Sequence, residues 1–240
     1  YDAFAGATLE EVIGRPPGEL SRREIVTMDH TLFLNRGDHF EPKPLPAEAQ
    51  LAPAFYAGVA DFDGDGREDV FLSQNFFATA DETPRYDAGR GLLLLGDGDG
   101  GLDAVPGQAS GIEVYGEQRG AAFADYDGDG RTDLVVTQNG AETVLYRNQE
   151  ARPGLRVRLE GPPGNPNAVG ARIRVVYSDG MGPAREVRGG SGYWSENGAV
   201  QVMGTSGEPR SVRVHWPSGR TTTDSIPPGV EEIVVEAGGD

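Results

Sequence analysis

One acidic nine-residue segment occurs twice in this chain of 240 residues and constrains its fold more than any other feature. The first copy, residues 61–69, reads DFDGDGRED, and the second, residues 125–133, reads DYDGDGRTD. The likeness extends beyond the acidic segment, because residues 60–75 read ADFDGDGREDVFLSQN and residues 124–139 read ADYDGDGRTDLVVTQN. The chain therefore contains an internal repeat.

Each copy carries carboxylates at its first, third, fifth and ninth positions, which a tight turn can bring to one point. With the main-chain oxygen of the seventh residue they suit a hard cation that takes roughly six to eight oxygen ligands, and we expect calcium. Glycines at the fourth and sixth positions permit the positive φ angles of a loop that curls around an ion. The predicted ligands are Asp61, Asp63, Asp65, Arg67 (main chain) and Asp69, then Asp125, Asp127, Asp129, Arg131 (main chain) and Asp133.

The sequence around the acidic loops argues against an EF-hand. An EF-hand loop has a glutamate at its twelfth position and lies between helices, whereas the twelfth positions here are Leu72 and Val136. Short apolar runs at 70–72 and 134–136 follow the loops and favour strands. A pair of acidic surface turns that bind nothing is the alternative, but it requires the same carboxylates and glycines to recur by chance.

Composition and charge limit the classes of fold and partner. The 36 glycines and 17 prolines, without long amphipathic runs, favour many short strands and little helix. Residues 1–150 hold 11 basic against 28 acidic residues, and residues 151–240 hold 10 of each, so the net charge of −17 lies in the first part. An acidic half argues against nucleic acid or an anionic membrane as a partner and for bound cations, with solubility as the other explanation.

Further absences exclude other chemistry. The chain has no cysteine, so it can form no disulfide, thiol nucleophile or cysteine-ligated metal site. No apolar run approaches the roughly 18 residues that a membrane helix needs, so we expect no membrane insertion. Because position 1 is a tyrosine, we expect a chain processed or cut from a longer one, with any signal peptide already removed.

Turn-forming residues between apolar runs predict hairpins in the first part. A hairpin is expected at 32–40, with counterparts at 92–102 and 144–149 after the two acidic loops. Each unit then runs as a strand, an acidic loop, a second strand and an outer hairpin. The adhesion tripeptide at 36–38 falls in the turn of one of these repeated hairpins, and we interpret it as a coincidence. Asp97, Asp99 and Asp103 are candidates for a third cation site, with a plain turn as the alternative.

Two other segments of the first part are expected to differ from strands. A short helix is expected to begin at Glu10 and to stop before the glycines and prolines of residues 14–18. The first repeat carries a longer loop, residues 76–91, with three aromatic residues. Long loops with their own aromatic residues serve as binding elements or lids, or the rings pack on a neighbouring strand.

The composition changes near residue 150. Residues 155–159 alternate between apolar and basic, which is typical of a half-buried strand. Further strands are expected at 172–177, 185–188, 200–203, 212–216 and 232–235. Five or six strands over this length predict a small β-sandwich or barrel. We therefore predict two domains, residues 1–150 and residues 151–240.

The repeats resemble FG-GAP or VCBS repeats, the calcium-loop blades of integrin α-subunits and of many secreted bacterial proteins. The second part is similar to an ASPIC/UnbV domain in GNPNAVGA (164–171), GSGYWS (190–195) and VHWPSG (214–219). Together they resemble the C-terminal part of a bacterial member of the cartilage acidic protein family. The resemblance implies an all-β chain with partial β-propeller-like blades, calcium in each acidic loop and an extracellular setting. A closed propeller needs about four to eight blades, and this chain has at most three.

These patterns predict a secreted calcium-binding structural or interaction protein without catalysis. Incomplete blades leave sheet faces and edges open, so a homo-oligomer or filament is expected, with a fragment of a longer propeller protein as the alternative. An adhesin that binds a glycan or a surface protein is a second hypothesis, because Tyr193 and Trp194 could stack on a sugar. Core packing of Trp194 is the alternative explanation.

A hydrolase is the third hypothesis, and the sequence supports it least. Ser191 misses the G-x-S-x-G pattern because Tyr193 holds the last place. His30, His39 and His215 have no matching nucleophile or metal-ligand spacing. A carboxylate pair for glycoside hydrolysis stays open among 38 acidic residues, but the best-placed carboxylates are those of the two loops.

Overall fold

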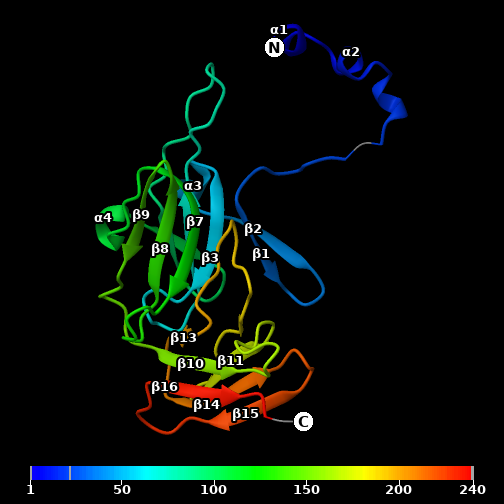
Figure 1. Ribbon diagram of the computed structural model, residues 1–240. Helices are drawn as coiled ribbons and strands as arrows, with labels where there is room; N and C mark the ends of the chain where they lie inside the picture. The colour runs from blue at the N-terminus through cyan, green and yellow to red at the C-terminus, as the bar shows by residue number, and fades with distance from the viewer. Residues whose placement is uncertain (1, 22, 239–240) are drawn as a thin grey trace.

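The computed structural model describes residues 2–21 and 23–238 and shows an all-β protein. Helix accounts for 8% of the residues and strand for 39%, as the glycine- and proline-rich sequence predicts. Figure 1 shows that the stretch with α1 and α2 stands away from the body, which has an upper part that contains β3 and β7–β9 and a lower part that contains β10 and β16. None of the helices in the described residues is long and apolar enough to cross a membrane.

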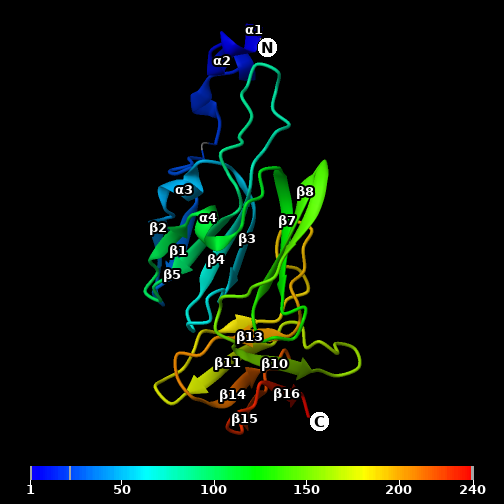
Figure 2. The ribbon, with the colours of Figure 1, turned by 90° about the vertical axis from the view of Figure 1, so that its left-hand side faces the viewer.

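The N-terminal residues form short helical turns and then a hairpin, and the hairpin lies beside the body (Figure 2). The elements are α1 (Asp2–Ala5), α2 (Leu9–Ile13), η1 (Pro17–Glu19), β1 (Thr31–Asn35) and β2 (Phe40–Pro44). The predicted short helix is confirmed as α2. It begins with a capping box between Thr8 and Glu11 and ends at Gly14, which adopts a left-handed conformation with φ 68°. The first predicted hairpin is confirmed by the antiparallel pairing of β1 with β2.

The first acidic loop lies in a four-stranded antiparallel meander. Its elements are α3 (Ala47–Gln50), β3 (Ala54–Ala60), β4 (Asp69–Gln74), β5 (Leu92–Gly96) and β6 (Leu102–Val105), in the sheet order β3-β4-β5-β6. The acidic loop joins β3 to β4, so the predicted strand–loop–strand context is confirmed. The long loop between β4 and β5 projects from the end of the sheet opposite to β10–β16 (Figure 2).

The second acidic loop lies in a three-stranded meander. Its elements are α4 (Gly107–Ser110), β7 (Glu117–Ala124), β8 (Asp133–Asn139) and β9 (Ala141–Tyr146). The hairpin predicted at 144–149 is wrong, because residues 144–146 complete β9 and pair with β8. After β9 the Asn148 side-chain amide donates to the carbonyl oxygen of Phe62 at 2.8 Å, so the chain contacts the first meander at this point.

The two meanders pack against each other along β3 and β7. The Phe123 ring meets the Phe62 ring edge-on, with centroids 4.9 Å apart, and the Tyr56 ring at 5.6 Å. A side chain at Gly58 would overlap the Phe123 ring, so the close approach depends on this glycine. The described residues form no closed ring of blades, and the propeller-like interpretation stays a prediction.

Residues 155–236 form a β-sandwich, as the sequence predicts. Its strands are β10 (Leu155–Glu160), β11 (Arg172–Tyr177), β12 (Arg185–Glu186), β13 (Gln201–Met203), β14 (Pro209–His215), β15 (Thr221–Ser225) and β16 (Glu232–Glu236). The sheet orders are β13-β10-β16 and β12-β11-β14-β15. One core cluster is buried between them, and Val157, Val175 and Val212 are among its fully buried members. The sequence did not predict β15, because its polar residues TTTDS show no apolar alternation.

Candidate functional site

Both acidic loops fold around their first aspartate. In the first loop Asp61 Oδ1 accepts hydrogen bonds from the amides of Gly64 at 2.7 Å and Asp65 at 3.2 Å, and Oδ2 accepts from Gly66 at 2.8 Å. The two glycines have φ angles of 76° and 88°, which residues with a side chain rarely adopt. Asp125 accepts the equivalent three bonds in the second loop, at 2.8–3.0 Å.

The turns bring carboxylates together as the repeat predicts. One oxygen from each of Asp61, Asp63 and Asp65 lies within 4.8 Å of the others, and Asp125, Asp127 and Asp133 form the equivalent group in the second loop. All six donors are carboxylate oxygens, which suit a hard divalent cation such as calcium. The clusters offer no imidazole or thiolate, the usual ligands of zinc.

The ninth aspartate closes each loop. Asp69 Oδ2 accepts from the Phe62 amide at 2.7 Å and Oδ1 from the Gly96 amide at 2.9 Å, so both oxygens are engaged. Asp133 accepts from the amides of Tyr126 at 3.1 Å and Asn148 at 2.8 Å. Asp69 therefore lies beside the first three-carboxylate group rather than in it, whereas Asp133 belongs to the second.

Burial raises the pKa of three carboxylates in the two loops. Removal from water raises the pKa of Asp69 to about 7, although the amides of Gly96 and Phe62 partly oppose the shift. Burial also raises the pKa of Asp61 and of Asp133, and a neighbouring aspartate adds to each shift. The crowded carboxylates therefore favour a bound positive charge, supplied by a proton or by a metal ion.

Arginine distinguishes the two loops. In the second loop Arg147 Nε lies 2.6 Å from Asp127 Oδ2, and Arg131 NH1 lies 3.0 Å from Asp129 Oδ2. Arg156, from β10, places its Nε 3.0 Å from Asp125 Oδ2. In the first loop, by contrast, the described residues provide one guanidinium that contacts an aspartate. It belongs to Arg67, which pairs with Asp65. The second loop is thus partly neutralised by the chain itself.

Both loops pack against the start of the C-terminal part. The Arg152 amide donates to the Asp63 carbonyl oxygen at 3.1 Å, and the Gly154 amide donates to the Gly130 carbonyl oxygen at 2.7 Å. A side chain at Gly64 would overlap the main chain of Arg152. The loop glycines therefore serve two purposes, a positive φ angle and a close approach between the two parts of the chain.

The predicted third cation site is not formed. Asp97 Oδ1 accepts hydrogen bonds from the amides of Asp99 at 2.8 Å and Gly101 at 2.7 Å, which makes it the cap of its own turn. The carboxylate groups that the structure brings together in the described part of the chain do not include Asp97, Asp99 and Asp103. The alternative of a plain turn agrees with this geometry.

The remaining candidates from the sequence lie outside the acidic loops. Trp194 is 94% exposed with φ 49°, so the expectation of core packing is wrong, and Trp216 is the buried tryptophan. The Tyr193 ring stacks on Trp194, with centroids 6.3 Å apart, and meets the Phe55 ring edge-on at 5.9 Å. The aromatic residues therefore form an exposed ladder beside β3.

The candidate catalytic groups are engaged separately in the structure. Ser191 Oγ donates to Asn197 Oδ1 at 3.1 Å. The Nδ1 atoms of His30, His39 and His215 contact Ala49 O, Asp38 Oδ1 and Thr221 Oγ1 at 2.7, 2.7 and 3.1 Å. In the described residues these contacts do not join the serine to a histidine.

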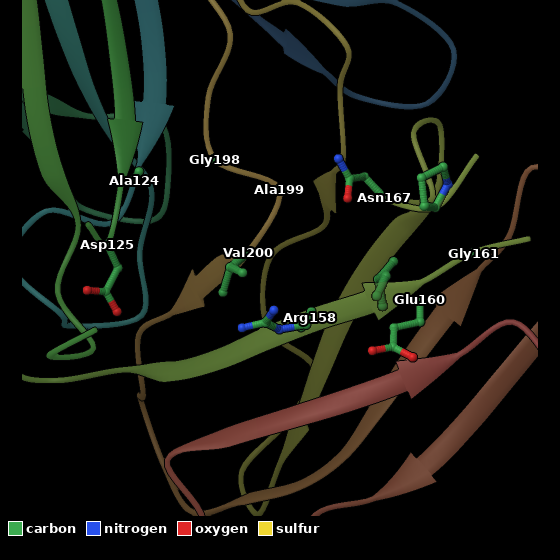
Figure 3. A pocket seen from close by; sticks show the side chains of 11 residues that line it. Ala124, Asp125, Arg158, Glu160, Gly161, Asn167, Gly198, Ala199 and Val200 are labelled. Atoms are coloured by element: carbon green, nitrogen blue, oxygen red, sulfur yellow. The ribbon is translucent and has the colours of Figure 1, made fainter. Parts of the chain in front are cut away.

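A groove opens beside the second loop, between the end of β7, residues 198–200 and β10. Its volume is about 540 Å³, and it is bordered by Asp125, Arg158, Glu160 and Asn167. Figure 3 shows Arg158 on β10 and Asp125 at the end of β7, with the side chain of Val200 drawn between them. The Asp125 side chain itself is fully buried.

Sequence reasoning missed three residues that complete the site: Asn148, Arg156 and Arg185. Arg156 is one of the basic residues that alternate along β10, and this pattern does not show which of them reaches the acidic loop. Arg185 pairs with Glu68 from across the junction, 117 positions away along the chain. Local patterns carry no signal for pairs this distant.

The sequence also matches known proteins. The family model described as "ASPIC and UnbV" matches residues 161–239, so an ASPIC/UnbV domain is present in the second part. Cartilage acidic protein 1 of Homo sapiens is 26% identical over 223 residues, which are 86% of this chain and 32% of that protein. Cartilage acidic protein 1 of Mus musculus is 29% identical over 209 residues, which are 82% and 31%. The chain thus spans about a third of the length of these relatives.

Proposed function

We propose that this chain is a calcium-binding structural or interaction module of an extracellular protein and that it performs no catalysis. One observation carries the proposal: two loops of the same spacing each gather three carboxylates within 4.8 Å. The ASPIC/UnbV domain and the similarity to cartilage acidic protein 1 support it. Carboxylate-rich loops of extracellular modules work at millimolar calcium, which suits a secreted setting.

The ligands would come from both loops. Asp61, Asp63 and Asp65 would hold one ion, and Asp125, Asp127 and Asp133 a second. The sequence also predicts Asp69, Asp129 and the main-chain oxygens of Arg67 and Arg131 as ligands, although both Asp69 oxygens accept hydrogen bonds from main-chain amides. Each ion would offset the repulsion between carboxylates at a loop that also touches the C-terminal part. Calcium would therefore stabilise the strand ends and the junction together.

Thermal unfolding with calcium, magnesium and chelator tests this proposal. At a calcium concentration one hundred times the dissociation constant, each site adds about 2.7 kcal/mol to the free energy of unfolding. Magnesium should stabilise less, because its small octahedral shell does not suit a carboxylate-rich wrapping loop. Asp63→Ala and Asp127→Ala should each shrink the calcium-dependent gain, while Asp38→Ala, at an exposed hairpin turn, should not. Equal melting curves in calcium and chelator would refute calcium binding.

Glycan binding is the second candidate function, and the exposure of Trp194 favours it. A tryptophan that is 94% exposed, with a stacked tyrosine beneath it, offers a flat apolar surface to the face of a sugar ring. The test is a glycan array with the native chain and the Trp194→Ala variant. Binding that disappears in this variant but persists in Trp216→Phe would support the lectin hypothesis.

Self-association is the proposed mode of assembly. Exposed apolar side chains lie on both meanders, including Val59 of β3 at 58% and Leu145 of β9 at 53% exposure. Another copy could cover such surfaces, and a head-to-tail contact that does not close would build a filament. Light scattering at high protein concentration in millimolar calcium tests this proposal. A monomer under these conditions would remove the filament and leave calcium binding unaffected.

A further inference from the structure

We propose that Arg156 is an internal counter-ion at the second acidic loop, where it competes with a bound cation. The first loop would then bind the cation tightly, and the second loop would bind it weakly, in exchange for the Arg156 contact. This inference rests on the proposed calcium-binding function and adds an order of filling to it. It also connects the second site to the C-terminal sandwich, because Arg156 lies on β10.

Arg156 reaches the second loop from across the junction. Its Nε lies 3.0 Å from Asp125 Oδ2, and the Asp125 side chain is fully buried. A Cβ added to Gly128 would lie 3.3 Å from Arg156 NH1, so the guanidinium lies beside the tip of the loop. Asp125 is also a member of the three-carboxylate group. A positive charge of the chain itself thus contacts a carboxylate that a cation would need.

The Arg156 contact can be exchanged because it is imperfect. Nε is buried and makes no hydrogen bond, so its contact with Asp125 is electrostatic without a well-directed N–H. The same guanidinium already has a second partner, since its NH1 lies 3.0 Å from Glu232 Oε2 on β16. A cation among the second group of aspartates would repel Arg156 and leave it paired with Glu232.

The charges around the loops predict which site fills first. The four aspartates of the second loop face three arginines: Arg131, Arg147 and Arg156. Within the described residues, one guanidinium contacts an aspartate of the first loop, that of Arg67, because Arg185, which also lies at this loop, is paired with Glu68. Since like charges repel and unlike charges attract, the first loop attracts a divalent cation more strongly. Unequal affinities follow, although the two loops have nearly the same sequence.

Calcium titration calorimetry on the full chain tests the proposal. The native chain should show one tight and one weak site, and Asp63→Asn should remove the tight one. Arg156→Gln should tighten the weak site about tenfold, because a unit charge at about 6 Å in a water-like dielectric changes the affinity for a divalent ion by that factor. Arg210→Gln is the charge-matched control, because Arg210 is 64% exposed on β14 and lies 3.6 Å from Glu208.

A second variant should change the calcium affinity of the weak site in the opposite direction. Glu232→Gln removes the alternative partner of Arg156, so Arg156 should hold Asp125 more firmly and the weak site should become weaker. Two equal sites, or a weak site that neither Arg156→Gln nor Glu232→Gln changes, would overturn the role of Arg156 while calcium binding stands. If titration of the native chain with calcium gave no heat of binding, the proposed function itself would be overturned. Circular dichroism of each variant confirms that it is folded.

Discussion

Arg185 of β12 binds both carboxylate oxygens of Glu68, a residue of the first acidic loop. Its Nε lies 2.9 Å from Oε1 and its NH2 lies 2.9 Å from Oε2, and NH1 donates to the Val202 carbonyl oxygen at 2.7 Å. Paired guanidinium and carboxylate groups of this kind fix orientation as well as distance. The Arg185 side chain is 9% exposed. The first loop is therefore attached to the C-terminal sandwich by a nearly buried ion pair.

Arg185→Met should loosen this junction. The variant leaves the Glu68 carboxylate and the Val202 carbonyl oxygen without their partner, and we expect a loss of about 2–4 kcal/mol in the free energy of unfolding. In scanning calorimetry, the melting temperatures of the two parts should differ more in this variant than in the native chain. Arg188→Met is the control, because Arg188 is 64% exposed and lies 3.6 Å from Glu186. Similar losses in both variants would contradict the role assigned to Arg185.

Stability without calcium should fall as the pH rises from about 4 to about 7. Burial raises the pKa of Asp69 from 3.8 to about 7, so in this window the folded state binds more protons than the unfolded state. At about 1.4 kcal/mol per pH unit, Asp69 alone accounts for roughly 4 kcal/mol. Calcium favours the ionised carboxylates and should remove the fall. Urea unfolding at several pH values, in chelator and in calcium, measures both slopes.

The Asp69→Asn variant checks the assignment of this pH dependence. Asparagine does not titrate, so the variant should show a flatter profile in chelator, although its amide nitrogen replaces one of the oxygens that accept from Phe62 and Gly96. Asp38→Asn, at the exposed turn of the first hairpin, should leave the slope unchanged. A slope that is the same in Asp69→Asn as in the native chain would assign the pH dependence to other carboxylates.

The repeat made the loops predictable, whereas their surroundings were not. Asp61 and Asp125 converge with their neighbours because loop geometry is local and the glycines impose it. The sandwich strands were recognisable by alternation, except β15, whose residues are polar. Arg156 and Arg185 depend on packing between distant segments, which no local pattern specifies. The exposure of Trp194 likewise depends on which surfaces the rest of the chain covers.

Gly64→Ala should destabilise the chain for two separable reasons. Gly64 has φ 76°, and a Cβ there would overlap the Arg152 main chain, so strain and steric overlap both act. Gly140 has φ 71° with open space around the added Cβ, and Gly140→Ala reports the strain alone. We expect about 1 kcal/mol from Gly140→Ala and at least about 2 kcal/mol from Gly64→Ala. Chemical denaturation of both variants gives the difference, and equal losses would show that Arg152 moves aside.

Glu117 anchors the start of β7, and Glu117→Gln should destabilise the protein. Its oxygens accept from the Phe77 amide at 2.6 Å and Asn139 Nδ2 at 2.9 Å, and Arg119 NH2 lies 2.7 Å away. Burial opposes the charge, but these donors outweigh burial and lower the pKa of Glu117 to about 2. The ionised Glu117 therefore contributes its full stabilisation of the folded state above about pH 4.5, and this contribution is lost as the pH falls toward 2.

The cost of Glu117→Gln should reach about 3–5 kcal/mol at neutral pH, because it leaves the Arg119 charge without its partner in a nearly buried site. That guanidinium also lies 4.0 Å from the centre of the Phe55 ring, so its release should disturb the aromatic ladder that ends at Trp194. Glu113→Gln is the control, since Glu113 is exposed and accepts from Tyr115 at 3.2 Å. Urea unfolding gives the stability, and tryptophan fluorescence reports the ladder. A loss below about 1 kcal/mol would mean that water replaces the carboxylate at Arg119.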